Sequence, residues 1–348
     1  MIKNNLKYLI PIFLLSLFGI LTIYMSKSIV VNYYDYLFKQ IIYLIIGIVL
    51  LFVIKKINFI YVKKYSLFFY IFCVLLLIYV LIFGESINGS KSWINIFGYS
   101  FQPSEFAKIA LLLCLDKYIN TKYGFIKCLF LLLIPSVLTF LQPDTGTVLF
   151  YLVIFFSVFI SLGLKRRYYI GLFSSIILLV FSYFYLYFFN SELFIDIFGT
   201  SFFYRTDRII NFMNSEGYQI NNALLGIGNG GIIGNWNNYV IYIPEAITDF
   251  MFASILTISG FLGGFFVIII FIYLDFLLVK DIYCLNKNKY FVIGLFGLFL
   301  YQQIQHIYMN IALLPITGIT LPFVSYGGSS LISYYILFGL LLNIKKYH

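Results

Sequence analysis

Residues 242–274 read YIPEAITDFMFASILTISGFLGGFFVIIIFIYL, in which a short polar segment runs into an almost unbroken apolar stretch. A membrane-spanning helix needs about 20 predominantly apolar residues. The stretch Phe250–Leu274 meets that length and is predicted to cross a membrane. The carboxyl group of Asp249 then lies at the mouth of a helix embedded in hydrocarbon. Because ionisable groups at such positions are costly unless they pair or do chemistry, Asp249 is the first candidate functional residue.

The rest of the chain has the same apolar character. Hydrophobic residues make up 62% of it and charged residues only 10%, whereas average chains carry about 25% charged residues. The first apolar run is long and lacks a small-residue cleavage site, so it is expected to remain as a helix rather than a signal peptide. The predicted fold is an all-α integral membrane protein of one domain, residues 1–348, with about ten membrane-spanning helices. Their predicted bounds are Leu6–Met25, Leu37–Ile54, Ser66–Phe83, Ser104–Ile119, Phe125–Leu141, Thr145–Leu164, Ile170–Phe189, Phe250–Leu274, Phe291–Leu314 and Phe323–Ile344.

The basic residues predict how the chain is oriented. With a cytoplasmic N-terminus, most of the 23 Lys and Arg residues fall in inner segments, so both termini are expected inside. The net charge of +10 therefore reflects membrane orientation, and nucleic-acid binding is excluded because no basic run is interleaved with aromatic residues in a solvated domain. None of the 4 cysteines lies in an outer segment or has metal-ligand spacing, so neither a structural disulfide nor a cysteine metal site is expected.

The first notable outer segment, Gly84–Pro103, reads GESINGSKSWINIFGYSFQP. Glycine and asparagine turns and the interfacial Trp93 precede a proline that is expected to begin a helix. Ser104 and Glu105 belong to the first turn of that helix. Lys108 follows Glu105 by three positions and is expected on the same helix face.

The second outer segment, residues 190–248, is a large extracellular loop between the seventh and eighth helices. Its aromatic content argues against disorder. RTDRIINFM is predicted to form an amphipathic helix on the outer leaflet, with Arg205 and Arg208 on one face. These guanidinium groups suit a diphosphate, although anionic lipid headgroups would attract them equally. The glycine-rich GIGNGGIIG at Gly226–Gly234 is better explained by turns or close packing than by a phosphate loop.

Two stretches carry acidic candidates. Glu245 and Asp249 are four residues apart, and if Pro244 opens a helix, both carboxyl groups lie on one face. Such a pair can have two different pKa values, which leaves one carboxylate as a general base near neutral pH. The alternative is that an acid in the first helical turn only complements the helix dipole. Asp144, in LQPDTGT, is either an N-cap or a site residue.

The ninth helix carries a row of polar residues inside the membrane, which are most often interhelical hydrogen-bonding groups. His306 is accordingly interpreted as structural. The sequence has no Ser-His-Asp set, HExxH motif or Walker loop, which argues against metalloproteases and ATP-driven proteins. It also lacks a transporter-type repeat. The polar row consists of Gln302, Gln303, Gln305, His306 and Asn310.

Together these segments resemble the SEDS family, which includes the cell-shape protein RodA, the cell-division protein FtsW and their sporulation relative SpoVE. The resemblance covers nearly the whole chain in family order and is slightly nearer RodA. The matching segments are NGSKSWI with FQPSEFAK (Asn88–Lys108), LQPDTGT (Leu141–Thr147), YRTDRIINFM (Tyr204–Met213), GYQ (Gly217–Gln219), GNGGIIG, IPEAITDF (Ile243–Phe250) and LLPITGITLPFVSYGGSS (Leu313–Ser330).

The resemblance implies an inverting peptidoglycan glycosyltransferase that polymerises lipid II at the outer face of the bacterial cytoplasmic membrane. The family's catalytic aspartate falls on Asp249, with Glu245 beside it. No cofactor is implied with certainty, and a divalent cation, Mg²⁺ or Mn²⁺, stays open. The implied partners are lipid II and a class B penicillin-binding protein. The implied substrate and diphosphate contacts are Arg205, Arg208, Lys108, Trp93, Gln102, Ser104, Glu105, Asp144, Gln219, Ser325, Tyr326, Gly327, Gly328 and Ser329.

The chain also departs from the family pattern at several positions. Asn235 replaces the lysine that usually follows the glycine run, and Ile247 replaces the usual histidine before Thr-Asp. Thr257 and Ile258 replace a pair of glutamates, and His306 replaces an asparagine. Two alternatives therefore stay open: a lipid II translocase, and a catalytically weakened scaffold that activates the penicillin-binding protein.

Overall fold

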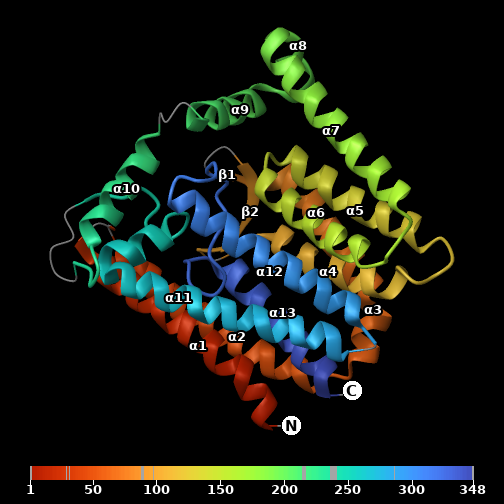
Figure 1. Ribbon diagram of the computed structural model, residues 1–348, viewed down its shortest axis with the longest axis horizontal. Coiled ribbons are helices and arrows are strands. Elements are labelled where there is room, and N and C mark those ends of the chain that lie inside the picture. Colours follow the sequence, from red (N-terminus) through yellow and green to blue (C-terminus); the bar gives the residue numbers. More distant parts are fainter. Residues whose placement is uncertain are drawn as a thin grey trace.

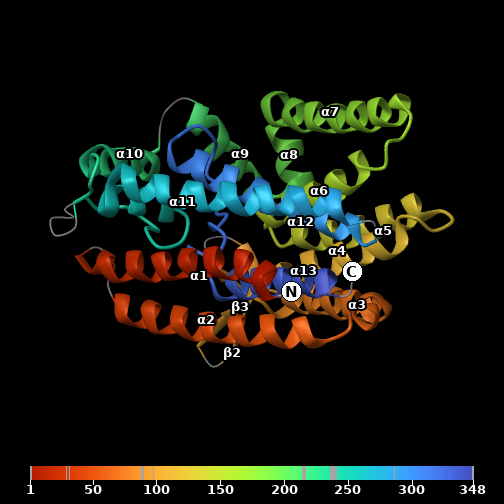
Figure 2. The ribbon, with the colours of Figure 1, turned by 60° about the horizontal axis from the view of Figure 1, so that its bottom comes forward.

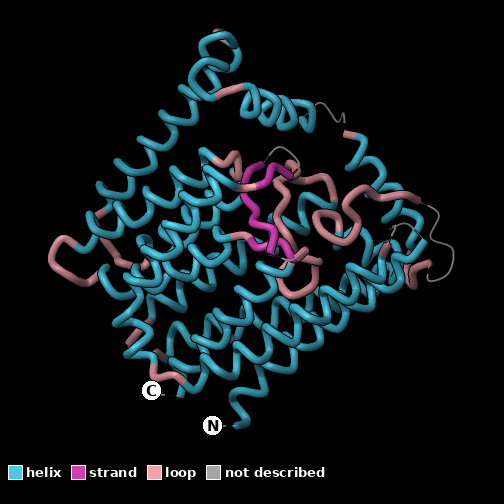
Figure 3. Tube along the Cα trace, turned by 180° about the vertical axis from the view of Figure 1, so that it is seen from behind, coloured by secondary structure: helices cyan, strands magenta, loops and turns pink. Residues whose placement is uncertain are grey.

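The computed structural model describes residues 2–28, 30, 32–87, 90–96, 98–213, 217–235, 241–285 and 287–346. These residues form a bundle of long helices with a small sheet at one end (Figures 1 and 3). The elements are α1 (Ile2–Met25), η1 (Ser26–Ser28), α2 (Tyr33–Lys56), α3 (Phe59–Phe83), β1 (Glu85–Ile87), β2 (Ser90–Ile96), β3 (Tyr99–Phe101), α4 (Pro103–Tyr118), α5 (Gly124–Leu141), α6 (Thr145–Ile160), α7 (Arg166–Phe189), α8 (Ser191–Phe198), α9 (Thr200–Met213), α10 (Tyr218–Gly230), α11 (Met251–Cys284), α12 (Lys289–Asn310) and α13 (Gly328–Lys346).

Every predicted membrane segment coincides with a helix, so the all-α fold class is confirmed. Among the described residues, 6 helices are long and apolar enough to cross a membrane by length and composition: α1, α2, α3, α5, α11 and α13. The full number of crossings stays a prediction. Local signals explain several helix starts. Pro103 begins α4, the Asn58 side chain accepts a hydrogen bond from the Ile60 amide at 3.0 Å, and Asp144 caps α6.

The bundle is centred on α4 and α13, whose side chains are almost all buried. Helix α13 packs along α2, and α4 packs against α3 (Figure 2). Glycine allows the close approach of α13 to α2, because a Cβ atom on Gly339 would lie 3.1 Å from the Leu51 Cα atom. Small residues at helix contacts are the usual means by which membrane helices pack closely.

The segment 190–248, predicted as a large outer loop, is more structured than a loop. It contains α8, α9 and α10, and the predicted amphipathic helix is confirmed as part of α9. Helices α7, α8 and α9 form an arc at the edge of the bundle (Figure 1). They share a small aromatic core of Tyr187, Phe194 and Phe202, and Phe202 stacks on Phe140 of α5 with ring centroids 4.4 Å apart.

The glycine run packs against a break in α11, which confirms the close-packing interpretation. Gly260 interrupts the helix with a φ of 65° and a ψ of −168°. The amides of Phe261 and Leu262 donate to the Gly231 and Ile232 carbonyls at 2.9 and 3.1 Å. Gly234 also has a positive φ of 92°, so this contact joins two backbones in a conformation that favours glycine.

The predicted outer segment Gly84–Pro103 contains an antiparallel sheet in the order β1-β2-β3, which its sequence did not indicate. Ile94 of β2 pairs with Phe101 of β3. The Lys91 amide donates to the Gln142 carbonyl at 3.1 Å, and the Gln142 side chain donates to the Leu77 carbonyl at 2.8 Å. These bonds attach the sheet to the adjacent ends of α3 and α5.

Candidate active site

A turn over residues 244–250, here called the Asp249 turn, precedes α11. The prediction that Pro244 opens a helix is wrong, because α11 begins at Met251 and Glu245 has a positive φ of 51°. A non-glycine residue rarely adopts this conformation unless its surroundings enforce it. Here the Glu245 carbonyl accepts hydrogen bonds from the amides of Thr248 and Phe250 at 3.2 and 3.0 Å.

The Asp249 side chain is half-buried in this turn, next to the exposed Glu245. Burial, and to a smaller extent the negative charge of Glu245, raise the pKa of Asp249 to about 7. A Cβ atom on Gly318 would lie 3.7 Å from Oδ2 of Asp249, so this glycine keeps the space beside the carboxyl group open. A carboxyl group with this pKa is partly ionised at neutral pH and can act as a general base.

Polar residues of α12 hold the turn and the start of α11. The Asn310 side chain donates to the Asp249 carbonyl at 2.9 Å and accepts from the Ala253 amide at 2.8 Å. Nε2 of His306 accepts from the Phe252 amide at 3.4 Å, while Nδ1 lies 2.7 Å from the Ile319 carbonyl. Since that Nε2 is an acceptor, Nδ1 carries the proton and the imidazole is neutral. The structural role predicted for His306 is confirmed.

The connection between α12 and α13, residues 311–327, lies against the Asp249 turn. Gln302 donates to the Thr320 carbonyl at 2.7 Å, which fastens the connection to α12. The Ser325 hydroxyl donates to the Thr248 carbonyl, and the Tyr326 amide donates to the Ile247 carbonyl, both at 2.8 Å. The predicted site residues Ser325 and Tyr326 therefore adjoin Asp249 through the backbone of its turn.

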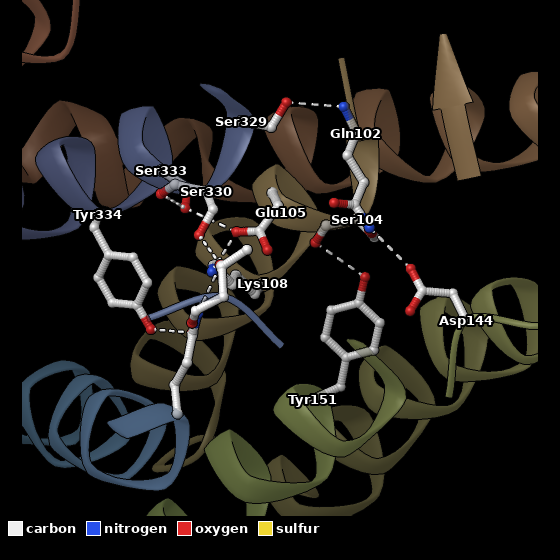
Figure 4. Close-up of polar contacts among 12 residues, drawn as sticks. Gln102, Ser104, Glu105, Lys108, Asp144, Tyr151, Ser329, Ser330, Ser333 and Tyr334 are labelled. Atoms are coloured by element: carbon white, nitrogen blue, oxygen red, sulfur yellow. Dashed lines mark hydrogen bonds and ion pairs between the residues drawn. The ribbon is translucent and has the colours of Figure 1, made fainter. Parts of the chain in front are cut away.

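Asp144 lies near the same connection. It caps α6 by accepting from the Thr147 amide at 3.3 Å, and it accepts from the Gln102 side chain at 2.9 Å (Figure 4). Burial raises the pKa of Asp144, against the opposing effect of these hydrogen bonds. A Cβ atom on Gly146 would lie 3.1 Å from the Thr317 carbonyl. Thr317 of the connection thus lies beside the start of α6, and the next residue, Gly318, lies beside Asp249.

Glu105 and Lys108 form an ion pair inside the bundle, which confirms that they share a helix face. The Ser333 hydroxyl donates to Glu105 at 2.9 Å, and Nζ of Lys108 lies 4.5 Å from the Tyr334 ring centroid (Figure 4). Ser104 is equally buried, and its carbonyl accepts from the Tyr151 hydroxyl at 3.1 Å. Direct substrate contact by these three residues is not supported, because Lys108 is 0% exposed and the other two are also buried.

The other predicted contacts are spread over several elements. Trp93 is half-buried in β2 and Gln219 in α10. The Ser329 hydroxyl accepts from the Gln102 amide at 2.9 Å. Gly327 and Gly328 lie beside Gln40 and Tyr43 of α2. Arg205 and Arg208 belong to α9, but their side chains lie outside the described part of the chain.

The divalent cation has no evident set of ligands in the described part of the chain. No group of three or more His, Cys, Asp and Glu side chains is arranged there to hold a metal ion. Asp144 and Asp249 each supply one carboxyl group beside the connection.

Sequence reasoning missed Gln40 of α2. Its side chain donates to the Ser325 carbonyl at 3.1 Å and accepts from the Gly327 amide at 3.4 Å, and it is 1% exposed. A single glutamine within an apolar helix was a signal for such a role, because polar residues in membrane helices usually have partners. Gly318, beside Asp249, carried no comparable signal.

Comparison with known proteins gives a consistent result. The family of cell cycle proteins FtsW, RodA and SpoVE matches residues 5–348. The chain is 32% identical to the probable peptidoglycan glycosyltransferase FtsW of Buchnera aphidicola subsp. Baizongia pistaciae, covering 86% of this chain and 82% of that protein. It is also 32% identical to the peptidoglycan glycosyltransferase MrdB of Helicobacter pylori strain 26695, covering 89% and 83% of the two chains.

Two solved structures are similar over almost the full length. One is a chain of a peptidoglycan synthase complex studied for its coordination of polymerization and crosslinking, with a TM-score of 0.81 and 25% identity over 97% of both chains. The other is the rod shape determining protein RodA of Thermus thermophilus, with a TM-score of 0.70 and 25% identity over 97% of this chain and 95% of that chain.

Proposed function

Because this chain belongs to the FtsW, RodA and SpoVE family and is a multi-pass membrane peptidoglycan glycosyltransferase, we propose that it polymerises lipid II with Asp249 as its general base. The observation that carries this assignment is the Asp249 carboxyl group itself. It is half-buried at the start of α11, and burial together with Glu245 raises its pKa to about 7. We further propose that this site faces the outside of the bacterial cytoplasmic membrane.

The proposed reaction is a single displacement with inversion. Asp249 accepts the proton of the acceptor sugar hydroxyl, whose oxygen forms the new glycosidic bond at the anomeric carbon of the donor. The bond between that carbon and the diphosphate breaks, and undecaprenyl diphosphate leaves with the electron pair. Positive charge near the leaving diphosphate would stabilise the transition state. Arg205 and Arg208 are proposed for this role because guanidinium groups match phosphate oxygens.

The buried polar residues are proposed to position the base. The side chains of Asn310 and Ser325 donate hydrogen bonds to the carbonyls of Asp249 and Thr248. These bonds fix the position of the backbone that carries the Asp249 carboxyl group. Gln102 and Asp144 are proposed to shape the opposite wall of the site. The ion pair of Glu105 and Lys108 supports that wall from inside, because it ties α4 to α13 through Ser333.

The similarity to a chain of a peptidoglycan synthase complex supports a partner. We propose that the chain works beside a class B penicillin-binding protein, which would cross-link the new strand. This proposal concerns assembly and does not alter the role of Asp249.

The weakened-scaffold alternative rests on the departures from the family pattern. At three of them, Asn235, Ile247 and Thr257, the present residues have structural contacts of their own. Ile247 is buried, and the Thr257 hydroxyl donates to the Ala253 carbonyl at 2.8 Å, while the Thr257 carbonyl accepts from the Asn235 amide at 3.1 Å. These contacts favour a site in which other residues pack around a retained base over a scaffold that has lost its site.

The test is a lipid II polymerisation assay on the purified chain together with its penicillin-binding partner. Wild type is expected to make glycan strands, and Asp249→Asn to make none above background. Equal polymer from both proteins would refute Asp249 as the base. Transport of lipid II across liposomes by both proteins, without polymer, would instead support the translocase.

A further inference from the structure

Four tyrosines from three separate segments pack together at the outer end of α2 and form what is here called the tyrosine cluster: Tyr36, Tyr43, Tyr99 and Tyr326. The Tyr36 and Tyr326 rings meet edge to face with centroids 5.0 Å apart, and Tyr43 meets Tyr99 at 5.9 Å and Tyr326 at 6.4 Å. Tyr43 is 5% exposed, whereas Tyr36 is 37% exposed and the other two are half-buried. The buried Tyr43 ring therefore supports Tyr99 and Tyr326, and Tyr326 in turn contacts the exposed Tyr36.

A cation lies at the edge of this cluster. Nζ of Lys39 is 5.8 Å from the Tyr99 ring centroid and donates to the Gly98 carbonyl at 2.9 Å. That single hydrogen bond leaves further donors on the ammonium group, which has three. The surface therefore combines aromatic rings with a positive charge that can meet a carboxylate.

The cluster is fixed to the Asp249 turn. The Tyr326 amide donates to the Ile247 carbonyl at 2.8 Å, and the neighbouring Ser325 hydroxyl bonds the Thr248 carbonyl. On its other side, the Ser325 carbonyl accepts from Gln40 of α2 at 3.1 Å. Tyr36 and Tyr326 are thereby held in a constant relation to the backbone that carries the candidate base.

We propose that the tyrosine cluster and Lys39 form a binding surface for the growing glycan strand, an inference that rests on the proposed function. Sugar rings present C–H groups on their faces, and the electron-rich faces of tyrosine rings attract such groups. Peptide-bearing amino sugars also carry carboxylates, which Lys39 would pair with. A polymerase needs such a surface, because the strand must stay beside the base while the next unit is added.

An interfacial aromatic belt is the simpler explanation for tyrosines at this depth. Tyr34 fits that explanation: it lies on the same helix, is 65% exposed and contacts Tyr33 with tilted rings whose centroids are 4.1 Å apart. A belt does not require rings from β3 and the connection before α13 to pack on one buried ring of α2. It also does not require their attachment to the Asp249 turn. Tyr34 therefore serves as the matched control for Tyr36.

The experiment measures binding of soluble, lipid-free, end-labelled glycan strands to the full chain in nanodiscs. An Asp249→Asn background and the absence of lipid II prevent polymerisation. Tyr36→Ala is expected to weaken binding about tenfold, as loss of a tyrosine anchor commonly does. Tyr36→Trp, which keeps an aromatic face, is expected to restore it, and Tyr99→Ala is expected to weaken it independently. Tyr34→Ala is expected to bind like the parent.

Unchanged binding by both Tyr36→Ala and Tyr99→Ala would overturn the proposal. An equal loss of strand binding in Tyr34→Ala would also overturn the proposal, because the effect would then come from the position of the chain in the membrane. Since no turnover is needed, this result is separate from the polymerisation test. Polymer made by Asp249→Asn would refute the proposed base without changing the strand-binding measurement.

Discussion

Two neighbouring carboxyl groups with different surroundings are the basis of the proposed chemistry at the residue scale. Asp249 is half-buried and Glu245 is exposed, four positions earlier in the same turn. Burial is the larger cause of the raised pKa of Asp249, and the negative charge of Glu245 adds to it. Asp249 thus has the raised pKa that its proposed role as general base requires.

Glu245→Gln is expected to move the rising limb of the pH–rate profile to lower pH. The negative charge of Glu245 raises the pKa of Asp249, so its removal lowers that pKa and lets the base ionise earlier. Glutamine can still accept the hydrogen bond that Thr248 donates to Glu245 at 2.8 Å, so the turn is kept. The measurement is lipid II polymerisation as a function of pH, with the exposed Glu192→Gln as control. A limb that stays in place, or moves to higher pH, would contradict the pairing.

At the element scale, the site depends on contacts between α12, the start of α11 and the connection before α13. The first turn of α11 carries amides that need acceptors, and His306 and Asn310 supply them. The row of polar residues in α12 therefore replaces the N-cap that Phe250 cannot provide.

Asn310→Ala is expected to reduce polymerisation about tenfold and to lower the melting temperature. The variant loses the bond to the Asp249 carbonyl and leaves the buried Ala253 amide without its acceptor. An unpaired buried amide costs about 1–3 kcal/mol. Thermal unfolding in detergent and the polymerisation assay check this together, with the exposed Asn120→Ala as control. Wild-type values in both assays would show that α12 does not hold the turn.

Gly260→Ala is expected to destabilise the protein through the contact between the glycine run and α11. Gly260 has a φ of 65°, and a Cβ atom there would collide with the Ile232 carbonyl and the Gly234 amide. The backbone strain alone costs about 1–3 kcal/mol. Gly171→Ala is the control, because a Cβ atom there meets open space. Equal melting temperatures for both variants would argue against the packed break in α11.

At the scale of the whole molecule, the arrangement of helices could be anticipated and the arrangement of the site could not. Apolar runs located the helices because hydrophobicity is a local property of the sequence. Asp249 was found for the same reason, at the end of such a run. The turn at Glu245 was missed because bonds from Ser325 and Tyr326, far along the chain, stabilise it.

The sheet and the burial of the Glu105–Lys108 pair were also missed. The short strands pair with one another and with the end of α5, and a nonlocal bond such as that from Lys91 to Gln142 leaves no periodic pattern in the sequence. The full burial of Lys108 was not predicted, because lysine is almost never fully buried unless paired. Its partners, Glu105 on its own helix and the rings of Tyr334 and Phe150, become visible only in the fold.

The predicted orientation can be tested with one native cysteine. Cys284, at the end of α11, is exposed, whereas Cys73, Cys114 and Cys128 are buried. A membrane-impermeant maleimide is expected to label Cys284 in inverted vesicles and not in intact cells, and Cys284→Ser is expected to abolish the signal. Labelling in intact cells would reverse the orientation and place Asp249 on the cytoplasmic side.

The pH dependence of lipid II polymerisation by the wild-type chain tests the role of Asp249 most directly. A general base must be ionised, so kcat/KM is expected to rise with pH through the Asp249 pKa of about 7 and then level off. Asp249→Asn is expected to lose both the polymerisation activity and the rise of kcat/KM with pH. A wild-type profile that is flat between about pH 5 and about pH 9, or a limb that persists in Asp249→Asn, would contradict proton transfer to this carboxylate.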